Sequence, residues 1–157
     1  MLESLNLLGQ TSLAGEKATE DFGARVGSVL KAGDWIGLVG QLGAGKTTLV
    51  RGVLQSFGLQ DVQSPTYTLI NQYQTNPKVN HLDLYRLENA EDLESIGYWD
   101  LEEDAITVVE WIDKIEEAWN GDGLILKLEY ASDSRIISGY GAGDWSKRLH
   151  ELWQVKE

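Results

Sequence analysis

Apolar side chains recur along the chain with the spacing of amphipathic helices. Phe22, Val26, Val29 and Leu30 fall at positions i, i+4, i+7 and i+8. They therefore line one face of a helix predicted over residues 16–30. Further helices are predicted over residues 47–57, 89–96 and 145–153.

Short runs of apolar and β-branched residues between turn residues predict the strands. They cover residues 35–39, 66–73, 79–85, 105–109, 124–130 and 135–140. Strands joined by a turn of a few residues must be antiparallel, because a parallel crossover needs a dozen or more residues. We therefore expect two hairpins, 66–85 and 124–140. They should extend, in antiparallel fashion, a parallel part made of strands 35–39 and 105–109.

The composition fits one globular domain. The chain has 157 residues, of which 42% are hydrophobic and 24% charged, and a chain of this size buries a sufficient core by itself. We expect residues 1–157 to form a single domain. The 25 acidic and 13 basic residues give a formal charge of −12. A protein that binds nucleic acid unaided needs a basic face, so a partner would have to hold any RNA; solubility alone explains the acidity equally well.

The chain contains no cysteine, which excludes disulfides, thiolate catalysis, zinc ribbons and iron–sulfur clusters. Its first residues carry no basic segment followed by an apolar core, so they do not read as a signal peptide. No apolar run approaches the ~18 residues needed to span a bilayer. The expected compartment is the cytoplasm.

The strongest chemical signal is a phosphate-binding loop. Residues 40–48 read Gly-Gln-Leu-Gly-Ala-Gly-Lys-Thr-Thr, which fits the pattern G-x-x-x-x-G-K-[ST] between a predicted strand and a predicted helix. Glycines let backbone N–H groups cradle phosphates at the positive end of the helix dipole. Lys46 is expected to reach the β- and γ-phosphates, and the Thr47 hydroxyl to bind Mg²⁺. The expected fold is therefore α/β, a three-layer P-loop NTPase-like fold with a mixed parallel/antiparallel central sheet.

A nucleotide site also needs an acid close to Mg²⁺ at the end of a buried strand. Glu110 follows the apolar run 106–109 and is the preferred metal-site residue, while Asp83 ends a more polar strand. Asp83 could contact the magnesium through water or orient the attacking water. A salt bridge to Arg86 is an equal alternative.

Other residues near these motifs carry weaker signals. Ser64, Thr66 and Thr68 could sense a γ-phosphate as switch loops do, but a polar strand start explains them as well. His81 belongs to no constellation that the residues alone suggest, so we expect a structural role for it. Trp111 follows Glu110 directly and is expected to pack beside the nucleotide site.

Three kinds of P-loop protein remain possible after simple exclusions. The chain lacks the N-K-x-D signature of GTPases and the L-S-G-G-Q signature of transporter ATPases. Small-molecule kinases clamp the transferred phosphate with arginines, and only Arg135 and Arg148 follow Arg86. An ATPase leads, and a small-molecule kinase and a nucleotide-gated interaction module without significant turnover are the alternatives.

Four motifs in order resemble the bacterial tRNA threonylcarbamoyladenosine biosynthesis ATPase family, TsaE. They are residues 40–48, Ser-Pro-Thr-Tyr-Thr-Leu at 64–69, His-Leu-Asp-Leu-Tyr-Arg-Leu at 81–87 and Val-Glu-Trp at 109–111. The resemblance implies a weak Mg²⁺-dependent ATPase that binds ATP and leaves ADP. It further implies a role in forming the threonylcarbamoyl group on the adenosine beside the anticodon of tRNAs that read codons beginning with A. The implied partner is the TsaB–TsaD heterodimer, through which alone tRNA would be contacted.

The resemblance also implies roles for individual residues. Nucleotide contacts are expected from Glu16, Leu42, Gly43, Ala44, Gly45, Lys46, Thr47, Thr48 and Arg135. Thr47 and Glu110 would hold Mg²⁺, Lys46 and Asp83 would act in hydrolysis, and Ser64, Thr66 and Thr68 would form the switch-like segment. Two positions depart from the family pattern. Gln41 stands where an acid is usual, and Ile112 stands where proline is common.

Overall fold

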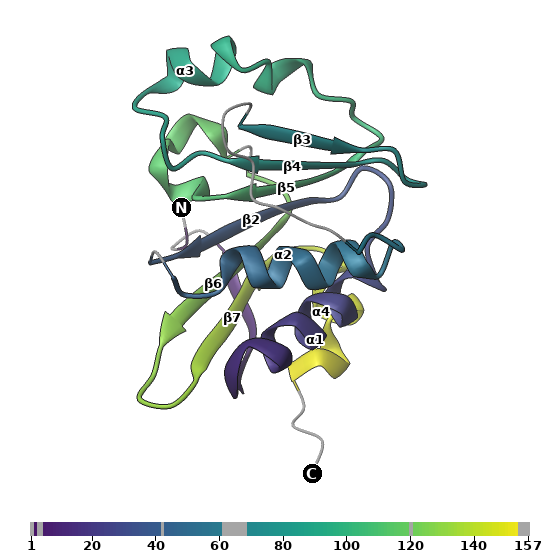
Figure 1. Ribbon diagram of the computed structural model, residues 1–157, viewed down its shortest axis with the longest axis vertical. Coiled ribbons are helices and arrows are strands. Elements are labelled where there is room, and N and C mark those ends of the chain that lie inside the picture. The colour runs from purple at the N-terminus through teal and green to yellow at the C-terminus, as the bar shows by residue number, and fades with distance from the viewer. Residues whose placement is uncertain (1, 3–4, 42, 61–68, 120, 154–157) are drawn as a thin grey trace.

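The computed structural model describes all residues except 1, 3–4, 42, 61–68, 120 and 154–157. Its centre is a seven-stranded sheet in the order β1-β7-β6-β2-β5-β4-β3 (Figure 1). The strands are β1 (Asn6–Leu13), β2 (Trp35–Gly40), β3 (Ile70–Tyr73), β4 (Val79–Asp83), β5 (Ile106–Glu110), β6 (Leu124–Tyr130) and β7 (Arg135–Gly141). The α/β fold class with a mixed sheet is confirmed.

The parallel part of the sheet is larger than the sequence predicted. β6, β2, β5 and β4 pair in parallel, and β3, β7 and β1 pair antiparallel at the two edges. Both expected hairpins form, as β3–β4 and β6–β7. The expectation that they only extend the sheet in antiparallel fashion is wrong, because the inner strand of each hairpin joins the parallel part. A short turn makes the two strands of a hairpin antiparallel to each other. It does not determine whether the hairpin pairs in parallel or antiparallel fashion with the next strand of the sheet.

β1 was not predicted. It is an edge strand with mixed exposure, and its register against β7 shifts between Leu7 and Gly9. The ring of Trp153 lies where a Cβ on Gly9 would be, 2.2 Å from that position. A side chain at residue 9 would therefore collide with this ring, and the mixed exposure of residues 6–13 follows no clean alternation that predicts a strand.

The helices are α1 (Gly15–Gly27), α2 (Lys46–Gln55), α3 (Ala90–Ser95) and α4 (Trp145–Arg148). Short 3-10 turns occur at η2 (Tyr98–Asp100), η3 (Ile112–Lys114), η4 (Glu116–Ala118) and η5 (His150–Trp153). α1 ends three residues before its predicted end, and the predicted C-terminal helix is broken into α4 and η5. Among the described residues, no helix is long and apolar enough to cross a bilayer.

Two hydrophobic cores lie on the two faces of the sheet. One packs α1, α2 and α4 against β2, β6 and β7, and Figure 1 shows these helices grouped on one side of the sheet. The other packs the irregular segments after β4 and β5, among them Leu93, Ile112 and Ile115, onto the opposite side. The layers are therefore helix, sheet and a second covering layer of short helical turns.

Glycines bring α1 and α2 into backbone contact. A Cβ on Gly52 of α2 would lie 1.9 Å from the carbonyl oxygen of Glu20, and one on Gly23 of α1 would lie 2.2 Å from the carbonyl oxygen of Leu49. Any side chain there would push the helices apart. The close approach fixes α2, whose N-terminus follows the phosphate loop directly.

Candidate nucleotide-binding site

The loop between β2 and α2 has the backbone shape that its glycines permit. Gly43 and Gly45 have φ values of 81° and 109°, in the left-handed region where a side chain is strained. α2 starts at Lys46, with no acidic residue in its first turn and no side-chain cap at Gly45. The free N–H groups at this helix end form an anion-binding site. Leu42 lies outside the described residues.

Lys46 is buried inside this loop. Only 5% of the residue is exposed, and its ammonium donates hydrogen bonds to the carbonyl oxygens of Gly40 at 2.5 Å and Gln41 at 2.8 Å. It also lies 4.1 Å above the centre of the Trp111 ring, a cation–π contact. Burial lowers the pKa of Lys46, and the nearby carboxylate of Glu110 opposes that shift.

Glu110 joins the loop helix to the neighbouring strands. The Thr47 hydroxyl donates to Glu110 Oε1 at 3.0 Å, and His81 Nε2 lies 2.5 Å from Glu110 Oε2. Glu110 is 1% exposed and His81 is fully buried. Thr47 and Glu110, the two residues expected to hold Mg²⁺, are thus brought together, and their metal role stays a prediction. The His81 contact was missed, although His81 and Asp83 alternate along one strand and so share a face, which was a usable signal.

Asp83 lies opposite Glu110 in the parallel register of β4 and β5. Its Oδ1 accepts a hydrogen bond from the backbone N–H of Tyr85 at 2.9 Å. Burial raises the pKa of Asp83 above its ordinary value, and the Glu110 carboxylate adds to the rise. Asp83, Glu110, Lys46, Thr47, Thr48 and Trp111 line one cavity of about 240 Å³ together with Gly43 and Gly45. Residues far apart in sequence thus meet at the carboxyl ends of the parallel strands.

Glu16 and Arg135 line one cavity on the other side of the loop. This second cavity, of about 240 Å³, is also lined by Gly15, Thr19, Gly43, Ala44, Gly45, Thr48 and Asp133. The Arg135 guanidinium lies 4.3 Å above the Tyr130 ring, and the Glu16 carboxylate pairs with Arg51 at 3.3 Å. Both residues therefore border the same loop glycines as the Glu110 cavity does.

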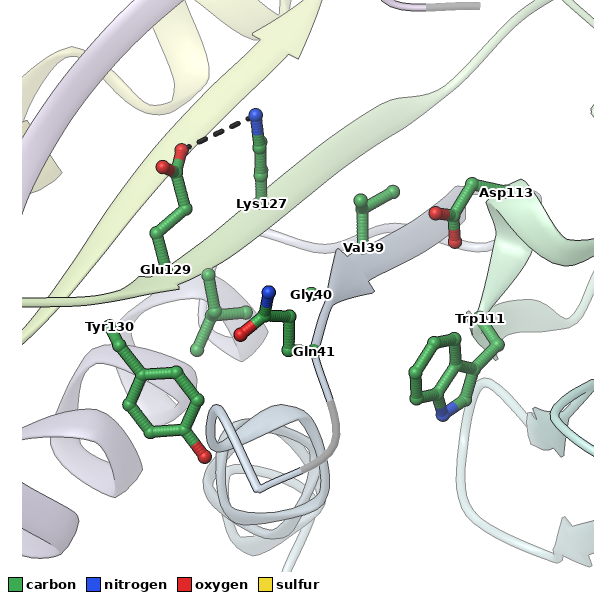
Figure 2. A pocket seen from close by; sticks show the side chains of 9 residues that line it. Val39, Gly40, Gln41, Trp111, Asp113, Lys127, Glu129 and Tyr130 are labelled. Carbon is green, nitrogen blue, oxygen red and sulfur yellow. Dashed lines mark ion pairs between the residues drawn. The ribbon is translucent and has the colours of Figure 1, made fainter.

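A larger cavity of about 590 Å³ was not foreseen from the sequence. Figure 2 shows Tyr130 and Trp111 on opposite sides of Gln41, which follows the end of β2. Asp113 lines it near Trp111, and Lys127 and Glu129 line it from β6, where they form an ion pair of 3.4 Å. The predicted place of Trp111 is confirmed, since it borders both this cavity and the one around Glu110.

Some of the residues that the sequence singled out lie outside the described part of the chain. Ser64, Thr66 and Thr68 all fall there, so the switch-like segment stays a prediction. Ile112, which replaces a common proline, is fully buried. The strand ends at a left-handed Trp111 (φ 61°) that leads into η3.

The donor atoms fit a hard cation bound together with phosphate. In the part of the chain that the structure describes, no three His, Cys, Asp or Glu side chains gather into a metal cluster. Thr47 and Glu110 offer oxygen atoms only, beside a loop shaped for phosphate. Mg²⁺ prefers this arrangement, because it is usually held by one or two protein oxygens plus substrate phosphates and water.

The chain matches known proteins over most of its length. Residues 13–137 match the family described as threonylcarbamoyl adenosine biosynthesis protein TsaE. Three relatives carry the name tRNA threonylcarbamoyladenosine biosynthesis protein TsaE. The Haemophilus influenzae protein is 44% identical over 103 residues, 64% of this chain and 65% of that protein. The Aquifex aeolicus protein is 33% identical over 135 residues, 83% of this chain and 94% of that protein. The Mycobacterium tuberculosis protein is 34% identical over 143 residues, 83% of this chain and 85% of that protein.

A solved structure shares the fold. The crystal structure of Bacillus subtilis YdiB superimposes with a TM-score of 0.74 and 25% sequence identity, over 94% of this chain and 95% of that one.

Proposed function

The chain belongs to the TsaE family of threonylcarbamoyl adenosine biosynthesis proteins, and from that premise we propose that it is a weak Mg²⁺-dependent ATPase of tRNA modification. It binds ATP and releases ADP. It is required for forming the threonylcarbamoyl group on the adenosine beside the anticodon of tRNAs that read codons beginning with A. It acts on the TsaB–TsaD heterodimer in the cytoplasm, and those partners hold the tRNA.

One observation carries the proposal. The Thr47 hydroxyl, at the first turn of the loop helix, lies 3.0 Å from Glu110, at the end of the neighbouring parallel strand. In P-loop proteins these two elements supply the hydroxyl and the acid that hold Mg²⁺ against the nucleotide phosphates. The backbone of the loop and the side chain of Lys46 supply the phosphate contacts beside them.

The residues divide the chemistry between them. The α2 N-terminus and Lys46 bind the phosphate oxygens, so the ammonium exchanges its two carbonyl partners for anionic oxygens and makes stronger, charge-assisted bonds. Thr47 and Glu110 would hold Mg²⁺, which when bound would neutralise phosphate charge. Asp83 orients the attacking water and takes up its proton, and the raised pKa of its half-buried carboxyl suits that task. Trp111 covers Lys46 and limits its access to water.

The net negative charge of the chain favours contact with tRNA through partner proteins. The formal charge of −12 opposes unaided binding to a polyanion. A partner that carries the basic surface removes this repulsion, which is consistent with action on a protein complex.

Phosphate release from Mg-ATP tests the proposal. It is measured for the protein alone, with the purified TsaB–TsaD pair, and with Lys46→Ala as control. Slow release that rises with the pair supports it, and threonylcarbamoylation of tRNA in the reconstituted system should depend on Lys46. Modification that Lys46→Ala leaves unaffected would overturn the proposal.

The cavity of about 590 Å³ beside the loop gives the kinase alternative its one structural support, because an acceptor molecule fits next to the phosphates there. This alternative predicts a phosphorylated metabolite by mass spectrometry after incubation with ATP. A nucleotide-gated module without turnover predicts instead that ATP-dependent partner binding survives Asp83→Asn while phosphate release does not rise.

A further inference from the structure

His81 is a buried titratable side chain that the proposed hydrolysis does not use. It lies in β4, two residues before Asp83, and none of its surface is exposed. Burying an imidazole costs free energy unless its nitrogen atoms find partners. Its Nε2 does find one, at 2.5 Å from Glu110 Oε2 on the adjacent strand.

Both oxygens of the Glu110 carboxylate are held by this arrangement. Oε1 accepts from the Thr47 hydroxyl at 3.0 Å, and Oε2 faces His81. One holding group comes from the loop helix and the other from the strand on the far side of β5. Two hydrogen bonds at the two ends of a carboxylate fix both its position and the plane in which its oxygens lie.

The two ring nitrogens of His81 lie in different surroundings. An ionised carboxylate only accepts, so Nε2 must donate. Nδ1 is buried and has no hydrogen-bond partner among the described residues. Among the described residues, Glu110 is therefore the hydrogen-bond partner that the His81 ring has.

We propose that His81 is a positioning residue for the magnesium site, which orients Glu110 toward the cation. This inference rests on the proposed function, because it assigns Glu110 to Mg²⁺. His81 itself touches neither metal nor nucleotide. When a group that hydrogen-bonds to a metal ligand is removed, metal affinity typically falls by about 10–100-fold.

The test measures how much Mg²⁺ strengthens nucleotide binding. ADP affinity is determined by calorimetry with Mg²⁺ and with excess EDTA, and the ratio of the two is the magnesium effect. His81→Met keeps the volume and loses the donor, while His81→Gln keeps an N–H near the position of Nε2. We expect His81→Met to reduce the magnesium effect about tenfold, with the EDTA affinity unchanged, and His81→Gln to retain most of it.

Two control experiments distinguish a positioning role of His81 from a general disturbance of the fold. Asn80→Ala removes a neighbouring buried side chain of β4 that has no contact with Glu110 in the described structure, and it should leave the magnesium effect unchanged. In a Glu110→Gln background His81→Met should cause no further loss, because coupled residues are non-additive. If His81→Met does not fold, His81→Asn replaces it, since its shorter amide cannot reach Glu110.

The outcomes are distinct. A donor-free His81 variant with the full magnesium effect overturns the positioning role and leaves the proposed function standing. Equal losses in the wild-type and Glu110→Gln backgrounds also overturn it, because His81 would then act elsewhere. A wild-type protein whose ADP affinity ignores Mg²⁺ overturns the proposed function and this inference together.

Discussion

The two ends of the parallel strands differ in the side chains that they bury. At the carboxyl ends, and in the loop helix after β2, the charged or titratable side chains of Lys46, His81 and Glu110 are buried among apolar ones. At the amino ends, aromatic rings pack edge to face. Trp35 meets Trp119 with ring centres 5.1 Å apart, and Tyr98 meets Trp99 at 4.9 Å. The Tyr98 hydroxyl donates to the carbonyl oxygen of Ala118 at 2.6 Å.

The two ends of the strands contribute to the free energy of folding with opposite signs. Buried Lys46 and half-buried Asp83 both have pKa values shifted against their charged forms, so the carboxyl end is costly to fold and suited to a charged ligand. At the amino end Tyr98 is buried, Trp35 and Trp119 are partly buried, and the contacts among their rings favour folding. Substitutions at the carboxyl end should therefore change ligand binding, and substitutions at the amino end should change unfolding.

The largest effect is expected from Lys46→Ala. Loss of charge-assisted hydrogen bonds worth about 1.5–3 kcal/mol each should weaken ATP binding by about 100-fold or more, while the free energy of unfolding changes little. Calorimetric titration and urea unfolding measure the two quantities. Lys31→Ala, an exposed lysine near the amino ends, is the charge-matched control and should bind ATP normally. A strong loss of stability in Lys46→Ala would break the comparison.

Glu110→Gln should come next. The amide keeps the shape and removes the negative charge, so Mg²⁺ should no longer strengthen nucleotide binding as it does in the wild type. We expect a loss of about 10–100-fold in the magnesium effect, with Mg²⁺-free affinity retained, by titration with and without EDTA. Unchanged magnesium dependence would mean that another residue holds the cation.

The amino end should respond to alkaline pH. Burial raises the pKa of Tyr98 from 10.0 to about 12. A group whose folded pKa is raised stabilises the fold below its unfolded pKa and loses that contribution as pH rises through the folded one. The free energy of unfolding should therefore fall between about pH 10 and pH 12, by up to about 3 kcal/mol.

Tyr98→Phe tests the source of that alkaline loss. It should cost about 1 kcal/mol at neutral pH for the lost hydrogen bond, and its stability should depend less on pH above 10. Urea unfolding as a function of pH measures both, and ATP affinity serves as the control because it should not change. Identical alkaline profiles for the two proteins would contradict the role of Tyr98.

The smallest effect is expected from Gln41→Glu. The Gln41 side chain lines the large cavity, and only its backbone oxygen contacts Lys46. An added surface carboxylate near the phosphates should weaken ATP binding by about threefold, and less at high salt. Titration at two ionic strengths checks this. An effect as large as that of Lys46→Ala would place the side chain in direct contact with the nucleotide.

Much of the site was accessible from the sequence because its signals are local. Gly43, Gly45, Lys46 and Thr47 are near neighbours, so their spacing alone predicts a phosphate-binding loop. The backbone has the left-handed glycines and the helix start that such a loop needs. Thr47 and Glu110 were each recognisable from local signals, Thr47 from the loop motif and Glu110 from the apolar run before it. Their hydrogen bond is known only from the structure.

Other features were decided only when distant segments packed together. The contact of His81 with Glu110 and the cavity that Glu16 and Arg135 both line beside the loop depend on the order of strands in the sheet. β1 pairs with β7, and the ring of Trp153 packs against its Gly9, so both of its neighbours come from the far end of the sequence.

The sequence by itself determined the phosphate loop, the two hairpins and the helices α1 and α2, since each depends on residues within about one or two turns of each other. The tertiary structure decided which strands are neighbours, and hence that His81 contacts Glu110. Periodicity describes which face of a strand is buried, and only long-range pairing decides what that face meets.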